Sequence, residues 1–542
     1  MATDFEYPWQ FTGRRSATMA HGGMVATSQP LAARAGLRIL EDGGTAADAA
    51  VATAAVLNVV EPNMTGIGGD MFALTQFDER YEALNGSGGA PAAADIETYR
   101  DRTDATTADG TPAMPVEGGM PVTVPGALDG WQRLLDRYGR LDLATVLEPA
   151  IEYAREGFPV SEYIAWQWQN AVDRLSQYEE SARTFLINGD APDPGQTVTN
   201  PTIAETFETI GAEGIEAFYG GPIGEAVVET AREHGGTLTL DDLTSHTGEW
   251  TEPISTTYHG MEVLEHPPNG QGAIALTALN IAEQFDLPDD PTHPDRLHHL
   301  IEATKLGFAD GTEYITDPAM AEIPLETMLS KDYAAERAAS IGSRAGTYAP
   351  GASAYGNDTI YLTVVDEDGN AVSLINSVYA NFGSGLTAAG FALQNRGHSF
   401  SLDPDHNNAL EPGKRPYHTI IPAMLREDDT FRAAWGVMGG SMQPQGHLQV
   451  VGNLVDADLN PQAAMDVPRF RWLDGRRVAI ETSRMPESVV ATLRGYGHRI
   501  VAEEEYYGNL GHFGGGQMIY IDDDGVRIGG SDPRKDGLAI GY

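Results

Sequence analysis

Apolar and polar positions near the start of the chain follow first the period of a β-strand and then that of a helix. A glycine-led apolar stretch at residues 21–28 predicts a strand, and apolar residues recur at helical spacing over residues 30–40. The Glu-Asp-Gly-Gly sequence at 41–44 ends that helix, since glycine favours the C-terminal cap. Thr45 can cap a second, alanine-rich helix over 46–60. We therefore expect one strand followed by two helices.

Helical periodicity also dominates the middle of the chain. Apolar residues at helical spacing predict helices over residues 128–138, 144–156, 223–234 and 295–316. Residues 251–275 return to strand and turn. A chain in which helices, strands and glycine turns alternate throughout is expected to adopt a mixed α/β layered fold.

The pattern changes sharply at residues 342–357, which are rich in Gly, Ala and Ser and have no periodicity. They predict an exposed, mobile linker. After it, residues 359–366 predict a strand, 367–370 a hairpin turn and 371–378 the returning strand. Residues 522–525 predict a similar turn near the end of the sequence.

The charge balance is strongly acidic. Among 542 residues, 78 Asp and Glu face 34 Lys and Arg, for a formal net charge of -44, and only four residues are lysine. Such a surface repels nucleic acid and anionic membranes, so neither is an expected partner. Concentrated salt makes this self-repulsion tolerable, since the Debye length is about 3 Å at 1 M. The composition is typical of a halophile that accumulates salt in its cytoplasm.

The sequence contains no cysteine, which excludes disulfides, thiolate metal sites and a cysteine nucleophile. The first residues carry no basic and apolar segments of a signal peptide. The most apolar stretch, residues 46–60, is too short to span a bilayer. We therefore expect a cytoplasmic protein.

One combination of features indicates a candidate catalytic residue: a linker, then Asn357-Asp358-Thr359, then a β-hairpin. If the bond between Asp358 and Thr359 is cut, Thr359 has both a hydroxyl and a free α-amine. An amine with an ordinary pKa of about 7.7–8 can act as general base on that hydroxyl. By itself, however, a threonine that opens a strand is usually no more than a good strand former.

Further motifs make the combination specific. In the second part of the chain they are segments 358–373, 381–385, 393–397, 412–416, 438–441 and 531–534. In the first part they are 39–50, 66–69, 124–126 and 213–219. In this order the motifs resemble those of the γ-glutamyltransferases, and the resemblance covers residues 20–542.

The resemblance implies a four-layer αββα sandwich of the N-terminal-nucleophile (Ntn) hydrolase type that needs no cofactor. The precursor would cut itself between Asp358 and Thr359 into a heavy chain 1–358 and a light chain 359–542, which form one αββα unit. Thr359 would then attack a small-molecule amide and pass the acyl group to water or an amine. The resemblance also implies a supporting hydroxyl at Ser377 and an oxyanion hole at Gly439 and Gly440. Assembly into higher homo-oligomers is left open.

The chain departs from the family where the glutamyl group is held. Ser87 stands where typical members carry an arginine for the α-carboxylate, and Ser399 where they carry an aspartate for the α-amine. The family's Ser-Ser pair appears as His418-Thr419. Arg396 offers instead a two-pronged hydrogen-bonding fork to a carboxylate.

Three functions follow from these features. The first is that of a γ-glutamyltransferase or glutathione hydrolase acting on γ-glutamyl-type amides. The second is that of an acylase or amidohydrolase on glutaryl-, oxamate-type or other carboxylate-bearing amides, and the altered pocket leads us to hypothesise such an acyl part. The third is non-catalytic binding of a small amide, which the presence of Thr359, Ser377 and the Gly439-Gly440 pair argues against.

Two weaker signals predict no additional site. The glycines of 66–69 lack the spacing of a dinucleotide-binding fingerprint. His293, His298, His299 and Glu302 lie close together in a predicted helix, but His298 and His299 point in different directions. We interpret these four residues as an ordinary helix surface, and we expect no metal.

Overall fold

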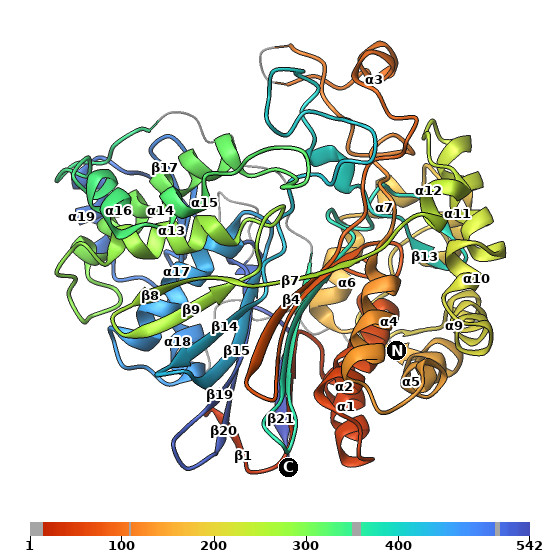
Figure 1. Cartoon of the computed structure of the whole chain (residues 1–542), viewed down its shortest axis with the longest axis horizontal. Helices are drawn as coiled ribbons and strands as arrows, with labels where there is room; N and C mark the ends of the chain where they lie inside the picture. Colours follow the sequence, from red (N-terminus) through yellow and green to blue (C-terminus); the bar gives the residue numbers. More distant parts are fainter. Residues whose placement is uncertain (1–14, 108–109, 349–358, 504–509) are drawn as a thin grey trace.

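The computed structural model describes residues 15–107, 110–348, 359–503 and 510–542, and two seven-stranded sheets face each other at its centre (Figure 1). Sheet I runs, in spatial order, β21 (Leu538–Gly541), β2 (Met24–Thr27), β10 (Ile360–Val365), β11 (Ala371–Ser377), β3 (Asp70–Phe77), β4 (Arg80–Gly86) and β7 (Glu249–Thr251). Sheet II runs β1 (Thr18–Ala20), β20 (Arg527–Ser531), β19 (Gly515–Ile521), β15 (Thr430–Met438), β14 (Ala423–Glu427), β9 (Met261–Glu265) and β8 (Ile254–Tyr258). Neighbouring strands in both sheets are antiparallel.

The predicted hairpin lies in the middle of sheet I. In the β10–β11 pair, Ile360 is opposite Asn376 and Val365 is opposite Ala371. Asp366 closes the turn, because its side chain accepts a 2.9 Å hydrogen bond from the N–H of Asn370. The hairpin expected over 359–378 is thus confirmed, and its open end carries Thr359.

Apolar side chains, half of them alanine, fill the space between the two sheets. The buried members of this layer are Ala20, Met24, Ala26, Leu74, Ala83, Leu264, Val365, Ala371, Met424, Ala434, Ile519 and Ala539. Toward the open end of the hairpin a separate buried cluster without alanine follows, formed by Phe72, Tyr361, Ile375, Ile420 and Met438. Side chains alternate along a strand, so Thr359 points to the same inter-sheet side as Tyr361.

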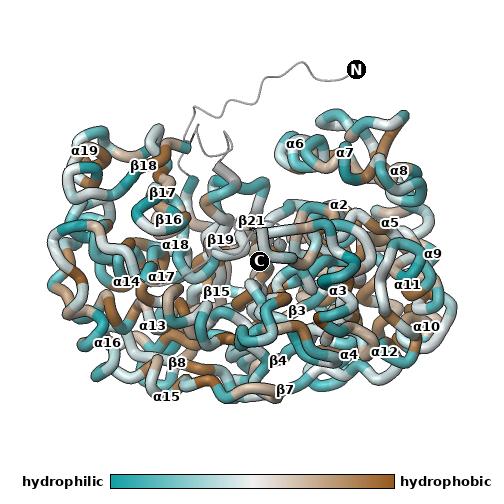
Figure 2. Tube along the Cα trace, turned by 90° about the horizontal axis from the view of Figure 1, so that it is seen from above, coloured by the Kyte–Doolittle hydropathy of each residue, from teal (hydrophilic) through white to brown (hydrophobic). Residues whose placement is uncertain are grey.

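Helices cover the outer faces of both sheets, as Figures 1 and 2 show. Beside sheet I lie α1 (Pro30–Glu41), α2 (Ala46–Val60) and α4 (Ala127–Tyr138), with α5 (Leu143–Glu156) packed on α2 and α9 (Pro201–Glu213) packed on α5. Beside sheet II lie α13 (Gly272–Ala282), α14 (Pro294–Tyr314), α17 (Met442–Val455) and α18 (Pro461–Asp466). The predicted αββα Ntn-hydrolase sandwich is therefore confirmed.

Shorter elements surround this frame. The remaining helices are α3 (Ile96–Arg102), α6 (Glu162–Gln169), α7 (Val172–Leu175), α8 (Glu179–Phe185), α10 (Glu216–Tyr219), α11 (Pro222–Glu233), α12 (Leu240–Thr244), α15 (Leu325–Met328), α16 (Lys331–Ala338), α19 (Glu487–Tyr496), η1 (Arg396–Ser399) and η2 (Leu510–Phe513). The remaining strands are β5 (Phe158–Pro159), β6 (Thr197–Val198), β12 (Thr387–Ala388), β13 (Phe391–Ala392), β16 (Phe470–Asp474), β17 (Arg477–Ile480) and β18 (Arg499–Ala502).

The helices predicted from periodicity are present, with bounds that differ by at most two residues. Thr45 caps α2 as expected: its hydroxyl accepts from the N–H of Asp48, and the Asp48 side chain accepts from the N–H of Thr45. Within the ranges that the structure describes, no helix is both long and apolar enough to cross a membrane.

Candidate active site

The hydroxyl group of Thr359 lies at the open end of the central hairpin. Thr359 is 1% exposed, and its Oγ1 lies 3.1 Å from Oγ of Ser377, the last residue of β11. The backbone N–H of Tyr379 donates to the same Ser377 oxygen at 2.9 Å. The Ser377 hydroxyl therefore holds the Thr359 hydroxyl, and the N–H of Tyr379 in turn fixes the position of the Ser377 hydroxyl. Asp358, the predicted partner in cleavage, lies outside the described residues.

Asp70 lies next to this pair because it is opposite Ser377 in the β3–β11 register. The glycines before it permit the close approach: a Cβ on Gly69 would lie 2.2 Å from the carbonyl oxygen of Ser377. The Asp70 carboxylate is fully buried and accepts hydrogen bonds from Gln394 Nε2 at 3.0 Å and His418 Nε2 at 3.1 Å. A buried acidic group thus stands directly behind the two hydroxyls.

The protonation states of Asp70 and His418 follow from their surroundings. Burial raises the pKa of Asp70 to about 7, although the charge of Arg396 and the bonds from Gly88 and Gln394 oppose the rise. His418 Nδ1 accepts from the N–H of Ile420 at 3.3 Å, so Nε2 carries the proton that points to Asp70. Burial lowers the pKa of His418 well below its ordinary value, and this ring is neutral.

Arg396 supplies a positive charge to the same interior. Its side chain is fully buried, Nη1 donates to Thr419 Oγ1 at 2.9 Å, and the guanidinium carbon lies 4.2 Å from the centre of the Tyr379 ring. Nε and Nη2 have no hydrogen-bond partner among the described residues. These two nitrogens form one edge of the planar guanidinium, the edge that fits the two oxygens of a carboxylate. Burial lowers the pKa of Arg396 to about 10, so it is charged at neutral pH.

Ser87 and Ser399 lie around these charged groups but add none of their own. Ser87 is buried, and its hydroxyl donates to Asn85 Oδ1 at 2.7 Å. Ser399 ends the short helix η1 that begins with Arg396. Burial raises the pKa of Tyr379, and the charge of Arg396 and a hydrogen bond with Ser399 lower it. Neutral hydroxyls thus stand at Ser87 and Ser399, two of the positions that the sequence analysis singled out.

The Gly439–Gly440 turn connects β15 to α17. Both glycines have positive φ angles, 128° and 59°, which favour glycine. The carbonyl of Gly439 accepts from the N–H of Met442 at 3.0 Å, and that of Gly440 accepts from Gln271 Nε2 at 2.9 Å. Since N–H and C=O point in opposite directions in a trans peptide, the N–H of Gly440 faces away from α17.

Packing places this turn near the hairpin. Met438, directly before the turn, packs in one buried cluster with Tyr361, which lies two residues after Thr359. Gln271 also donates to the carbonyl of Thr419 at 2.6 Å, which joins the turn to the neighbourhood of Arg396.

The structure thus links the predicted residues through three others that the sequence analysis did not single out: Asp70, Tyr379 and Gln271. For Asp70 a signal existed, since an acidic residue follows two glycines at the start of a strand. For Tyr379, whose φ angle is 78°, and for Gln271, the sequence carries no such signal.

Comparison with known proteins decides the family. The sequence profile described as gamma-glutamyltranspeptidase matches residues 32–542. The chain belongs to the gamma-glutamyltranspeptidase family. It is 39% identical to the glutathione hydrolase-like YwrD proenzyme of Bacillus subtilis strain 168, over 96% of this chain and 98% of that one. It is 33% identical to the oxamate amidohydrolase proenzyme of Klebsiella pneumoniae, over 97% and 100%. The structure of a cephalosporin acylase from Bacillus halodurans superposes with a TM-score of 0.93 at 44% identity, over 100% of this chain and 99% of that one.

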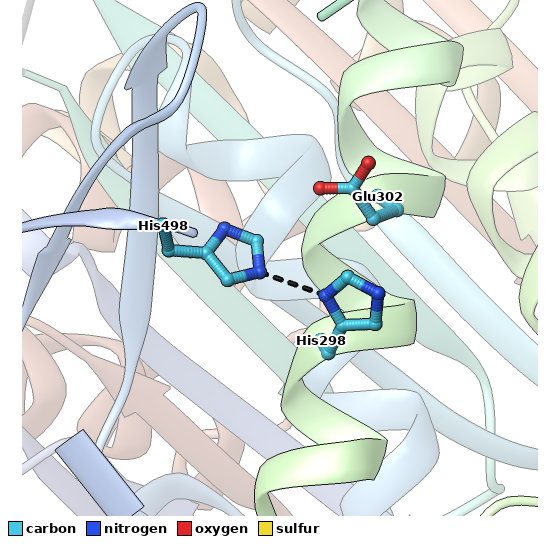
Figure 3. A group of neighbouring side chains, drawn as sticks. All are labelled: His298, Glu302 and His498. Carbon is cyan, nitrogen blue, oxygen red and sulfur yellow. Dashed lines mark hydrogen bonds between the residues drawn. The ribbon is translucent and has the colours of Figure 1, made fainter. Parts of the chain in front are cut away.

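A second cluster of titratable groups in this family member corrects one prediction. His298 and Glu302 do not lie on a helix surface: both are buried, and His498, directly before β18, joins them (Figure 3). His298 Nδ1 lies 2.8 Å from His498 Nε2. Glu302 is already neutralised by Lys305, whose Nζ lies 2.6 Å from Oε1. A divalent ion would enter beside this buried ammonium, so the cluster does not favour a metal.

The same cluster holds the backbone of residues 342–348. His298 Nε2 donates to the carbonyl of Gly342 at 2.8 Å, Lys305 donates to that of Gly346 at 3.1 Å, and Glu302 accepts from the N–H of Gly346 at 2.9 Å. The linker predicted over 342–357 is exposed at 342–344 and 347 as expected, but side chains of α14 hold its backbone at Gly342 and Gly346. Residues 349–357 lie outside the described residues. Irregular sequence is held in place here by buried side chains of α14.

Proposed function

We propose that this protein is a self-processing threonine amidase that hydrolyses, or transfers the acyl group of, small amides whose acyl part carries a carboxylate. The observation that carries the proposal is the contact between Thr359 Oγ1 and Ser377 Oγ, beside a buried Arg396 with one unoccupied hydrogen-bonding edge.

Two steps would use the same hydroxyl. In maturation, Thr359 Oγ attacks the carbonyl of Asp358, the peptide C–N bond breaks, and water hydrolyses the resulting ester to give chains 1–358 and 359–542. In turnover, the freed α-amine accepts the hydroxyl proton as Oγ attacks the substrate amide. The amine product leaves with a proton, and water or an acceptor amine then takes the acyl group. The Ser377 hydroxyl stabilises Thr359 Oγ, and the N–H groups of Gly439 and Gly440 stabilise the oxyanion.

Charge in the interior supports a carboxylate-bearing acyl group. The free edge of Arg396 matches a carboxylate, whereas a γ-glutamyl group also brings an ammonium. The nearby acid, Asp70, is fully buried and surrounded by donors from Gln394, His418 and Gly88, so it has no room for an ammonium. Ser399 is neutral. A glutaryl- or oxamate-type acyl group fits these charges better than a glutamyl group.

The intact mass of the protein purified in molar salt tests maturation. We expect two fragments that separate between Asp358 and Thr359, and a single chain for Thr359→Ala. A folded wild-type protein that stays whole would contradict self-processing and favour a non-catalytic binding protein.

Paired substrates test the acyl specificity of the matured enzyme. We expect a higher kcat/KM for glutaryl-p-nitroanilide than for γ-glutamyl-p-nitroanilide, with release of p-nitroaniline followed by absorbance. Faster turnover of the γ-glutamyl compound would overturn the proposed specificity and leave the mechanism standing.

A further inference from the structure

A buried pair, Glu265 and His447, lies behind the Gly439–Gly440 turn and has no part in the steps above. Glu265 is the last residue of β9, and His447 belongs to α17. Both side chains are fully buried, and His447 Nδ1 lies 2.6 Å from Glu265 Oε1. Burying polar groups costs free energy unless they are hydrogen-bonded, so the partners of these two side chains matter.

The other ring nitrogen of His447 holds the end of β15. The N–H of Val437 donates to His447 Nε2 at 3.1 Å. Since a backbone N–H can only donate, Nε2 is the acceptor and Nδ1 carries the proton toward Glu265. Burial lowers the pKa of His447 to about 3, so the ring keeps this neutral form at ordinary pH. Glu265 thereby fixes which nitrogen of His447 faces the strand.

This hydrogen bond stands where a strand partner is missing. The pairing of β14 with β15 ends where Ala423 is opposite Trp435, whereas β15 continues to Met438 beside β19. Val437 therefore has a strand neighbour on one side only. His447 satisfies the N–H that faces the other side, which would otherwise be buried without a partner.

Gly446 brings α17 close enough for this contact. A Cβ at Gly446 would lie 2.7 Å from Cγ1 and 2.9 Å from Cβ of Val437. Any side chain at this position would push the helix away from the strand. The glycine directly before His447 therefore sets the short distance between the imidazole and the Val437 N–H.

The connection from β9 to α13 thus contacts the Gly439–Gly440 turn from two sides. Glu265 acts through His447 on Val437, two residues before Gly439. Gln271 holds the carbonyl of Gly440 at 2.9 Å from the other side. Glu265 ends β9 and Gln271 directly precedes α13, so the two residues lie at the two ends of one short connection.

We propose that Glu265 and His447 are positioning residues for the oxyanion turn, which hold Val437 so that the N–H groups of Gly439 and Gly440 meet the reacting carbonyl. This inference rests on the proposed function. Because oxyanion stabilisation is stronger in the transition state than in the bound substrate, its loss lowers kcat and leaves KM nearly unchanged.

Three variants separate positioning from packing. His447→Leu removes the acceptor for Val437, whereas His447→Gln keeps one, since its amide oxygen reaches about as far as Nε2. Gln449→Leu is the matched control: Gln449 is a buried residue of the same helix, and its side chain bonds to Phe470 rather than to the turn. We expect kcat per cleaved chain to fall about 10- to 100-fold in His447→Leu with KM within twofold, and to return to within about threefold of wild type in His447→Gln. Gln449→Leu keeps the wild-type kcat.

Hydrogen exchange of the same variants, followed by mass spectrometry of peptides spanning 437–440, gives a readout independent of activity. We expect exchange at Val437 at least about tenfold faster in His447→Leu than in wild type and unchanged in Gln449→Leu. Unchanged exchange, or a folded and cleaved His447→Leu with wild-type kcat, overturns the inference. A wild-type protein that neither cuts itself nor turns over amides refutes the proposed function instead, while the exchange at Val437 still decides whether His447 holds the strand.

Discussion

Replacing Arg396 by methionine tests the charged group on which the proposed specificity depends. Methionine keeps an unbranched apolar chain of similar width but removes every donor of the guanidinium. Arg396→Met therefore loses the Nε–Nη2 edge and the bond from Nη1 to Thr419. The Thr359–Ser377 contact lies outside this change.

The size of the effect follows from burial. Arg396 is fully buried, so a substrate carboxylate on its free edge makes two charge-assisted hydrogen bonds away from water. Removing one partner of such a buried charged pair costs about 2–5 kcal/mol. Taking about 3 kcal/mol, kcat/KM for a glutaryl anilide should fall by about 100-fold, since each 1.36 kcal/mol is a factor of ten. An uncharged pentanoyl anilide of the same length should change by less than about threefold, since it cannot pair with the guanidinium.

The assay compares the two anilides in wild type, Arg396→Met and Arg396→Lys. The lysine variant restores the charge without the fork, so we expect it to recover only part of the lost kcat/KM. Arg426→Met, at a partly exposed arginine of β14 paired with Glu262, controls for the same chemical change elsewhere. Equal losses on the charged and uncharged substrates would refute the assignment of Arg396 to carboxylate recognition.

Three further predictions concern protonation, the buried ion pair and salt. Asp70, with a pKa raised to about 7, is protonated below that pH and ionised above it, where its negative charge offsets the positive charge of Arg396. The KM for a glutaryl anilide should therefore rise several-fold from pH 6 to 8. A flat pH profile, or a profile that Asp70→Asn leaves unaltered, would contradict this. Lys305→Met leaves the buried Glu302 carboxylate without its ammonium partner, so denaturant titration in molar salt should show a loss of about 3–5 kcal/mol in the free energy of unfolding. The double variant Glu302→Gln/Lys305→Met should recover part of this loss. Equal losses in the single and the double variant would count against the ion pair. The unfolding temperature should rise between about 0.1 M and 2 M KCl, where screening becomes short-ranged, and an unchanged or falling value would contradict the halophilic interpretation.

Local signals made much of the fold predictable. The periodic helices and the central hairpin depend on residues a few positions apart, and Thr45 caps α2 through Asp48, three residues away. The placement of Thr359 beside Ser377 was equally accessible, because both belong to one hairpin with a short turn.

The polar interior was not predictable in this way. Asp70 and His418 are 348 residues apart in sequence, and they meet because the segment before β14 packs against the start of β3, where the His418 ring lies 4.7 Å from the ring of Phe72. No periodic pattern encodes such a contact. His298 was wrongly placed on the surface for a related reason: the partner that makes its burial favourable, His498, is 200 residues away.

The four lysines of this acidic chain lie mainly in its interior. Of the four, Lys305, Lys414 and Lys535 are buried, and Lys331 is partly exposed but bonded to Glu283 at 2.5 Å. Lysine is therefore retained where an ammonium has a fixed partner, and the excess negative charge belongs to the surface. Salt screens exposed charges over short distances but affects buried pairs much less. The effect of Arg396→Met on the charged substrate should therefore persist in molar salt, whereas long-range repulsion of that anionic substrate by the acidic surface would be screened there.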